Sequence, residues 1–234
     1  MTIGIVVALP EELSTLTGQK LSQGDCVSIS ENILLTLAGA GPLNAERAAR
    51  LLISEGADKL ISWGCAAALA PNLKPGDLVL AEQLLSEQQQ SFHTEADWRQ
   101  HLHNLLDKHL PISGGTLAES SHIVADRDDK QHLYRQTGAV ALDMESCAIA
   151  KAAQYAKLPC IVIRAIADPA TMSLPQAVSQ ALNSQGQVEL GKLLRFLLSH
   201  PWEVPELIKL GLHFYAARKT LKTVAKYLTE IIHF

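Results

Sequence analysis

Residues 160–169 read Cys-Ile-Val-Ile-Arg-Ala-Ile-Ala-Asp-Pro, an apolar run that contains one arginine and stops at an acid followed by proline. Because the apolar residues do not alternate with polar ones, the run predicts a strand buried on both faces of a sheet. Similar runs occur elsewhere in the chain, most of them ending in Gly, Pro, Asp or Glu, at residues 3–8, 33–38, 60–63, 78–81 and 139–142.

Helical patterns separate several of these runs. Residues 44–55 are rich in alanine, with Asn44 placed to cap a helix, and residues 145–157 carry Ala and Ile at helical spacing. The polar residues 86–97 are predicted to form a surface loop. Alternating strands and helices predict an α/β sandwich. In such folds ligands bind beyond the carboxyl ends of the strands, so polar residues directly after the runs are site candidates.

The composition limits the classes of function. The chain has 234 residues, of which 47% are apolar, and a formal net charge of −4. This charge argues against a nucleic acid as the main partner, since phosphate binding needs clustered cations. No apolar run approaches the roughly 20 residues that cross a bilayer. The first residues lack the basic leader of a secretory signal, so we expect a cytoplasmic protein.

Neither a metal nor a dinucleotide cofactor is predicted. The four cysteines form no Cys-x-x-Cys pair, so disulfides and a zinc site are not expected. His101 and His103 are spaced so that one helix face does not carry both. The segment Ala-Gly-Ala-Gly-Pro at 38–42 resembles half a dinucleotide fingerprint, but proline follows at once and the third glycine is missing.

Carboxylates follow two of the predicted strands. Asp143 and Glu145 flank Met144 where a strand passes into a helix. The alternative to a functional role is that these acids only cap and complement the helix N-terminus. Asp168 also stands at the carboxyl end of a strand, and its alternative is a turn formed with Pro169.

An arginine inside an apolar strand must be paired, because a lone buried charge is costly. For Arg164 we expect Glu12 or Glu145 as the partner. Glu12 follows the first strand, where the alternative is a proline-started helix with acids in its first turn. The small residues Cys65 and Ala66 either let a ligand approach the backbone or permit tight packing of a helix on the sheet.

Five motifs occur in order over most of residues 1–200. They are Ile-Gly-Ile-Val-Val-Ala-Leu-Pro-Glu-Glu at 3–12, Gly-Cys-Ala-Ala-Ala-Leu at 64–69, Pro-Gly-Asp-Leu-Val at 75–79, Asp-Met-Glu at 143–145 and Arg-Ala-Ile-Ala-Asp at 164–168. Together they resemble the nucleoside phosphorylase and nucleosidase family, which includes purine nucleoside phosphorylases and methylthioadenosine/adenosylhomocysteine nucleosidases. The resemblance implies a three-layer α/β/α sandwich with a mixed central sheet, an enzyme acting on a purine nucleoside, and a homodimer.

The resemblance implies catalytic roles for three residues. Asp168 matches the acid that protonates N7 of a leaving purine. Glu12 matches the base that orients water, with Arg164 as its partner. Cleavage of the C–N bond passes through an oxocarbenium-like sugar, which needs an acid for the leaving group and an anionic environment. Asp168 needs a raised pKa to be that acid at neutral pH.

The resemblance also implies a binding site for the nucleoside. Met144 would pack on the ribose, and Glu145 would accept hydrogen bonds from its hydroxyls. His122 and Ile123 fall near the place where the base is held. The predicted site also includes Asp143, Cys65 and Ala66.

The chain departs from the family in two motifs. Gly-Cys-Ala-Ala-Ala at 64–68 stands where the family usually has Gly-Ser-Ala-Gly-Gly, and Ala167 stands where it often has serine. Hexameric phosphorylases place an arginine two residues before the first glycine of this loop, where this chain has Ser62. The missing hydroxyls and the missing arginine favour hydrolysis. Phosphate stays an alternative co-substrate, and no other cofactor is expected.

Further features resemble the hopanoid-associated phosphorylase branch of the family. This resemblance implies that adenine is removed from adenosylhopane, a nucleoside joined to a triterpenoid lipid. The alternatives are a phosphate-dependent purine nucleoside phosphorylase, a methylthioadenosine-type nucleosidase and a non-catalytic binder of nucleoside lipids. The features are Asp-Met-Glu-Ser at 143–146, Ile-Ala-Asp-Pro-Ala at 166–170, Leu-Pro at 174–175 and Pro-Trp at 201–202.

Residues 201–234 are predicted to form an amphipathic helical extension of a domain at residues 1–200. Apolar side chains are interspersed there with five basic and three acidic ones over residues 202–234. Such a segment would extend the substrate groove or lie on an anionic membrane surface that holds the lipid. The alternative is a pair of helices that packs on the core or on a dimer mate.

Overall fold

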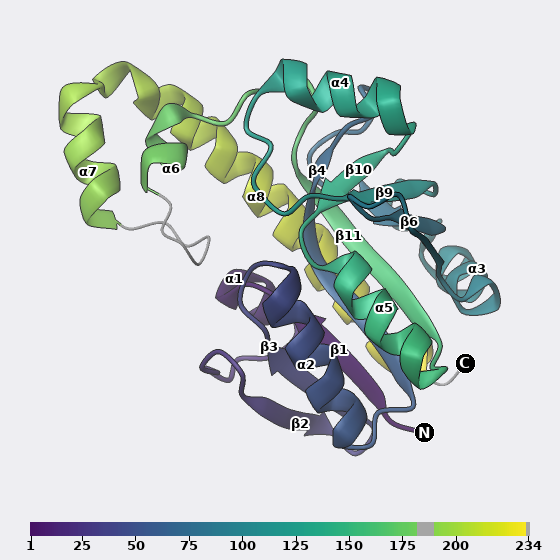
Figure 1. The fold of residues 1–234 in the computed structure, drawn as a ribbon. Helices are drawn as coiled ribbons and strands as arrows, with labels where there is room; N and C mark the ends of the chain where they lie inside the picture. Colours follow the sequence, from purple (N-terminus) through teal and green to yellow (C-terminus); the bar gives the residue numbers. More distant parts are fainter. Residues whose placement is uncertain (182–189, 233–234) are drawn as a thin grey trace.

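The computed structural model describes residues 1–181 and 190–232, in which a mixed sheet lies between two layers of helices (Figure 1). The predicted three-layer α/β/α sandwich is confirmed. The strands are β1 (Ile3–Val7), β2 (Cys26–Ser30), β3 (Ile33–Leu37), β4 (Lys59–Ala68), β5 (Leu78–Leu80), β6 (Gln83–Leu85), β7 (Ser91–His93), β8 (Ile112–Ser113), β9 (Thr116–Glu119), β10 (Ala141–Asp143) and β11 (Cys160–Asp168). The helices are α1 (Pro10–Leu13), α2 (Pro42–Ser54), α3 (Ala96–Leu106), α4 (Arg127–Thr137), α5 (Ser146–Ala156), α6 (Gln176–Ala181), α7 (Leu190–Ser199), the 3₁₀ turn η1 (Pro201–Glu203), α8 (Val204–Ala225) and α9 (Leu228–Ile232).

The sheet is built around β4 and β11, which run parallel along their length. On its other edge β4 pairs first with β1, in parallel, as far as Trp63. It pairs again from Ala67 onward, now with the antiparallel β10. Between these two partners, no strand of the described residues pairs with the backbone of residues 64–66 on that edge. The sheet therefore opens at the small-residue segment that the sequence singled out.

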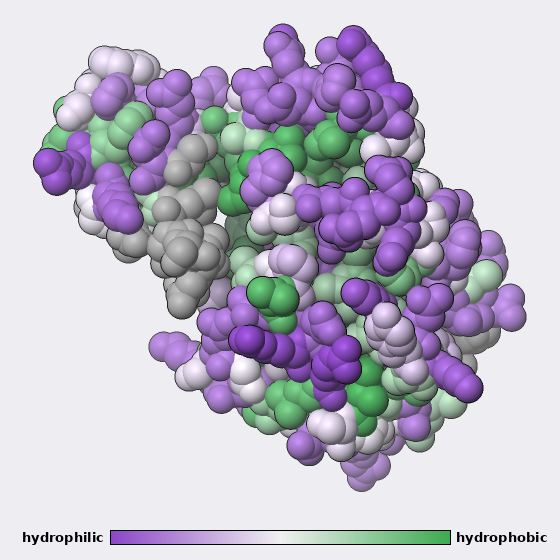
Figure 2. Space-filling view, in the orientation of Figure 1, coloured by the Kyte–Doolittle hydropathy of each residue, from purple (hydrophilic) through white to green (hydrophobic). Residues whose placement is uncertain are grey.

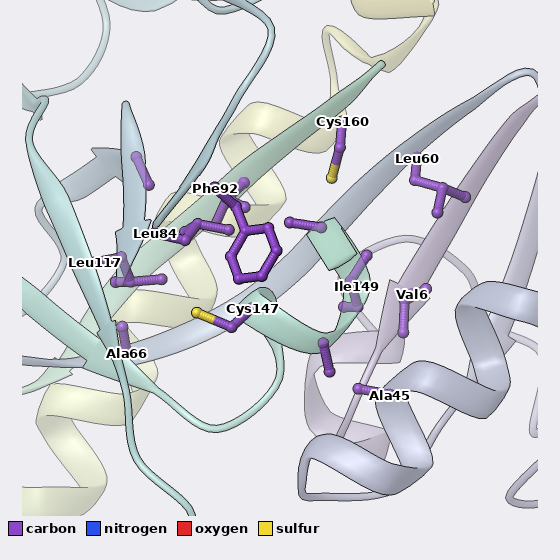
Figure 3. Close-up of a cluster of buried hydrophobic side chains, with 14 of the residues drawn as sticks. Val6, Ala45, Leu60, Ala66, Leu84, Phe92, Leu117, Cys147, Ile149 and Cys160 are labelled. Atoms are coloured by element: carbon purple, nitrogen blue, oxygen red, sulfur yellow. The ribbon is translucent and has the colours of Figure 1, made fainter. Parts of the chain in front are cut away.

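Apolar side chains fill both faces of the sheet. One buried cluster joins the strands to α2 and α5, through residues such as Ala45, Leu52 and Ile149 (Figure 3). The opposite cluster joins them to α3, α8 and α9, through residues such as Trp98 and Leu221. Every residue of β11 is buried, Arg164 and Asp168 included, and the largely apolar run at 160–166 predicts such a buried strand.

Residues 201–232 contain η1, α8 and α9. The second half of α8 packs on β11 and buries Ala217, Thr220, Leu221 and Val224, while its first half extends beyond the sheet with α6 and α7 (Figure 1). The division of the chain at residue 200 stays a prediction. Among the described residues, no helix combines the length and the apolar character that a bilayer-crossing segment needs.

Three details of the sequence prediction are wrong. Helix α2 begins at Pro42, after Gly41 in a positive-φ conformation, so Asn44 lies inside the helix and donates to the carbonyl of Ala40. The expected loop at 86–97 contains β7, which pairs with β6, and the start of α3. Strand β4 continues to Ala68 because its small residues fit between β11 and β10.

Gly4 of β1 tests how tightly α2 packs on the sheet. A Cβ at this position would lie 2.9 Å from Cδ2 of Leu60 and 3.0 Å from Cβ of Leu52. We expect Gly4→Ala to lower the free energy of unfolding by about 1–3 kcal/mol, because the core is overpacked. Urea denaturation measures this change. Gly18→Ala is the matched control, since nothing lies within 4 Å of its added Cβ, and equal losses in both variants would contradict the packing argument.

Candidate active site

A cavity of about 250 Å³ lies at the opening of the sheet between β1 and β10. Figure 2 shows hydrophobic residues gathered in the recess of the surface below α4. The cavity is bordered by the carboxyl ends of β1, β4, β10 and β11, where ligands are expected in an open α/β sheet. Of the predicted site residues, the cavity wall contains Glu12, Cys65, Ala66, His122, Ile123, Asp143, Met144, Glu145 and Asp168.

Arg164 lies behind this wall and is 1% exposed. Its Nε is 2.6 Å from Oδ2 of Asp143, and its Nη2 is 3.7 Å from Oε2 of Glu145. Nη2 also donates to the hydroxyls of Ser62, at 2.8 Å, and Ser146, at 3.1 Å. The sequence named Glu145 as a partner but missed Asp143, which is the nearer carboxylate.

Glu12 is held by backbone groups at the start of α1. Its Oε2 accepts from the N–H groups of Ala8 and Leu9, both at 3.1 Å, and its Oε1 accepts from Cys65 at 2.8 Å. Arg164 acts on Glu12 through its charge, without an ion-pair contact among the described residues. Burial raises the pKa of Glu12, although the charge of Arg164 and the backbone hydrogen bonds lower it.

The β10–α5 junction uses its two carboxylates differently. Asp143 Oδ1 accepts from the backbone N–H groups of Glu145 and Ser146, as the helix-capping interpretation predicts. The same carboxylate also forms the ion pair with Arg164. Glu145 instead reaches across to α2 and accepts from the N–H of Gly41 at 2.9 Å. Burial raises the pKa of Glu145 to about 7, against the charge of Arg164, which lowers it.

Asp168, at the end of β11, lines the same cavity. The pairing of β11 with β4 shifts register between Ile166 and Asp168, an irregularity of the kind that re-aims a side chain at the end of a strand. Oδ1 of Asp168 is 2.6 Å from Nζ of Lys130, which is fully buried. Burial raises the pKa of Asp168, and the charge of Lys130 and its hydrogen bond lower it.

The sequence did not identify Lys130. It lies in the polar segment Arg-Asp-Asp-Lys-Gln-His at 127–132, which is typical of an exposed helix and gives no sign that one cation is buried. His122 and Ile123 lie at the rim of the cavity and are exposed. Met144 is half-buried between the two carboxylates of its junction.

The two buried cations, Arg164 and Lys130, lie next to different carboxyls of the cavity. Glu12 and Glu145 lie near Arg164, and Asp168 is paired with Lys130. Separate carboxyls with raised pKa values in one cavity are suited to acid and base catalysis on a bound molecule.

Comparisons with known proteins show what the chain is similar to. A model of the phosphorylase superfamily matches residues 2–195. The 5'-methylthioadenosine/S-adenosylhomocysteine nucleosidase of Staphylococcus epidermidis is 25% identical over 196 residues, which cover 71% of this chain and 86% of the relative. The enzyme of the same name from Oceanobacillus iheyensis is 26% identical over 217 residues, which cover 80% and 94%.

Two solved structures from Helicobacter pylori share the fold. The 5'-methylthioadenosine/S-adenosylhomocysteine nucleosidase with butyl-thio-DADMe-Immucillin-A has a TM-score of 0.72 at 19% identity, covering 99% of this chain and 97% of that one. Futalosine hydrolase has a TM-score of 0.72 at 20% identity, with the same coverage. The similarity therefore extends over nearly the whole chain, the C-terminal helices included.

The raised pKa of Glu145 predicts a pH-dependent cost in stability. A buried carboxyl with a pKa near 7 stabilises the fold when protonated, and this contribution is lost as the pH rises from about 4.5 through 7. We expect Glu145→Gln to be more stable than the wild type at pH 8. The gap should widen by up to about 1.4 kcal/mol per pH unit between about pH 4.5 and 7 and level off above pH 7. Urea denaturation from pH 5 to 8 measures this, with Glu31→Gln at an exposed turn as the control. A gap that does not change with pH contradicts the prediction.

Proposed function

This chain belongs to the phosphorylase superfamily and is an enzyme, as its sequence predicts, and we propose that it hydrolyses the N-glycosidic bond of an adenine nucleoside. One observation carries the proposal. Asp168, paired with Lys130, lines the same cavity as Glu12 and Glu145, which lie near Arg164. The acid, the sugar acceptor and the base that the reaction needs are thus supplied from separate elements of the fold.

The proposed reaction uses each carboxyl once. The bond from C1′ to N9 breaks with its electron pair moving to the purine, and Asp168 gives a proton to N7. Glu145 accepts hydrogen bonds from the ribose hydroxyls and stabilises the oxocarbenium-like sugar. Water adds to C1′, and Glu12 takes its proton. Burial raises the pKa of Asp168, which favours the protonated form that this role requires.

The charges around the cavity favour water over phosphate as the nucleophile. The described lining residues include no lysine or arginine. Behind the wall Arg164 is engaged by Asp143 and Glu145, and Lys130 by Asp168. A phosphate dianion would enter a cavity lined by acids without a free cation to bind it. Phosphorolysis remains the alternative that an assay with phosphate decides.

Adenosylhopane is the substrate that we propose. The motifs shared with the hopanoid-associated branch support it, and the cavity opens to an exposed apolar residue, Ile123, at its rim. A small nucleoside of the methylthioadenosine type is the second candidate. It is favoured by the names of the relatives, which are 5'-methylthioadenosine/S-adenosylhomocysteine nucleosidases.

The outer face of α8 supports a contact with the membrane that would hold such a lipid. Four large side chains at helical spacing are exposed there, with Ile208 at 60% and Tyr215 at 67%. Three lysines continue the same face toward the C-terminus and are also exposed. Apolar and cationic groups on one face are suited to an anionic lipid surface. The residues of this outer face are Val204, Ile208, Leu212, Tyr215, Lys219, Lys222 and Lys226.

We place the protein at the cytoplasmic face of that membrane and propose that it is a homodimer. A second copy of the chain is the competing occupant of the outer face of α8. Both occupants would cover exposed apolar side chains, but only an anionic lipid surface would require the lysines.

Replacing the proposed acid tests the function. We expect Asp168→Asn to lower adenine release by about 10²–10⁴-fold, because general acid catalysis is lost while Oδ1 still accepts from Lys130. Adenine is measured by chromatography from adenosylhopane in detergent and from methylthioadenosine, each with and without phosphate. Asp129→Asn, an exposed acid on α4, is the control. Near-normal turnover in folded Asp168→Asn rejects the assignment, and binding of the lipid nucleoside without adenine release supports a non-catalytic binder.

Vesicle binding tests the outer face of α8. We expect the wild type to sediment with phosphatidylglycerol vesicles and to be released by salt, and expect Ile208→Ser with Leu212→Ser, or Gln at the three lysines, to prevent binding. Tyr155→Ser is the control, since Tyr155 is 70% exposed on α5. If vesicles bind none of the proteins and the serine variant turns a dimer into a monomer, the face is a dimer interface instead.

A further inference from the structure

Lys130 is buried on a helix that is otherwise largely exposed. Its side chain has no exposed surface, while Arg127, Asp128, Asp129 and Arg135 of α4 point to solvent. Burying a lysine is costly unless the charge is paired and its N–H groups are bonded. The packing of α4 alone therefore does not explain why a lysine is buried at this position.

The contacts of Nζ use all the donors of an ammonium group. Nζ donates to Oδ1 of Asp168 at 2.6 Å, to the carbonyl of Met172 at 2.8 Å and to the carbonyl of Pro169 at 3.4 Å. A lysine ammonium has three donors, so each has an acceptor. All three acceptors belong to the end of β11 and the turn that follows it. Lys130 thus ties α4 to the segment that carries the proposed acid.

The ion pair also orients Asp168. Because Oδ1 is bound to Lys130, the carboxyl cannot rotate freely, and Oδ2 has no hydrogen bond among the described residues. The preceding residue, Ala167, has no hydroxyl with which to hold the carboxyl. Asp168 itself lines the cavity. Oδ2 of Asp168 is therefore the carboxyl oxygen that is available to a bound molecule.

We propose that Lys130 is a positioning residue that holds Asp168 for proton transfer to the purine base. This inference rests on the proposed function, since it assigns the proton of Asp168 to N7. When the C–N bond breaks, the proton on Oδ2 moves to N7, and the electron pair of the bond moves to the base. The carboxylate that remains is left beside the Lys130 ammonium, which stabilises the charge at the moment it forms.

Lys130 is the one charged group that contacts Asp168 within the described part of the chain. The other titratable side chains around the cavity are Glu12 on α1, Cys65 on β4, Asp143 and Glu145 at the β10–α5 junction and His122 at the rim. Arg164, the other buried cation, is engaged by Asp143 and Glu145. Removing Lys130 should therefore act on Asp168 and leave the acids around Arg164 in place.

The test compares Lys130→Met with Lys130→Arg and with Arg135→Met, an exposed cation on the same helix. Carbon-13 NMR of labelled aspartate carboxyls, assigned with Asp168→Asn, follows the titration of Asp168 in each protein. The neighbouring cation lowers the pKa of Asp168, so Lys130→Met should raise it, by about 1–3 units. Lys130→Arg keeps the charge and should restore most of the wild-type titration. Arg135→Met should not change it.

Adenine release supplies the second readout. In Lys130→Met the maximal rate should fall by roughly 10²-fold, because the carboxyl is no longer held in place, with a smaller change in KM. At the same time the alkaline limb of the pH–rate profile should move upward, since the acid keeps its proton to higher pH. A lysine that only supports the fold would lower stability without moving this limb.

The two readouts separate the possible failures. If the Asp168 resonance titrates at the same pH in folded Lys130→Met and in the wild type, the positioning role is overturned, whatever the activity. If the resonance shifts as expected but the wild type releases no adenine, the coupling of the pair stands and the proposed function fails, and with it the role in proton transfer. Shifted resonance, slower release and a displaced limb together support the inference.

Discussion

The burial of Arg164 is the constraint on which the rest of the site depends. A guanidinium in the middle of a strand that is buried throughout must find carboxylates and hydroxyls without water, or the strand cannot form. Those groups come from β4, β10 and α5, so the charge fixes the place where these elements meet. Gly64 belongs to the same constraint, because a Cβ there would approach the Arg164 guanidinium and the Glu12 carboxylate closer than 3.0 Å. Arg164 is thus paired with Gly64 at the point where the sheet opens.

Lys130 and Arg164 together explain how several acids share a small cavity. Carboxylates that lie close together raise one another's pKa, and burial adds to the effect. Lys130 pairs with Asp168, whereas Arg164 lies among Asp143, Glu145 and Glu12, and the charges of Asp143 and Glu12 raise the pKa of Glu145. A reaction that needs a general acid beside the purine and a general base beside the sugar requires such separate environments. The two buried cations therefore set the charge around the acids of the site.

The sequence predicted what depends on local pattern and failed where distant groups meet. Apolar runs located the central strands because a buried strand needs them, and carboxylates after those runs located the cavity wall. The cap at Asn44 was wrong because Pro42 and Gly41 start the helix earlier. Asp143 was missed as the partner of Arg164 because β10 and β11, which carry them, come together only through their shared neighbour β4. Lys130 was missed because its acceptors lie 38 to 42 residues away along the chain.

Helix α8 lies between the core of the protein and its surface. Its inner face closes the core, and Arg218 donates to Ser14 directly after α1, the helix that carries Glu12. Its outer face has no part in these contacts, because residues three and four apart on a helix share a face and the buried set lies opposite the exposed set. Changes on the outer side therefore leave the cavity intact, whereas changes on the inner side would reach Glu12. The outer face of α8 is thus separated by the core of the protein from the cavity that Glu12 lines.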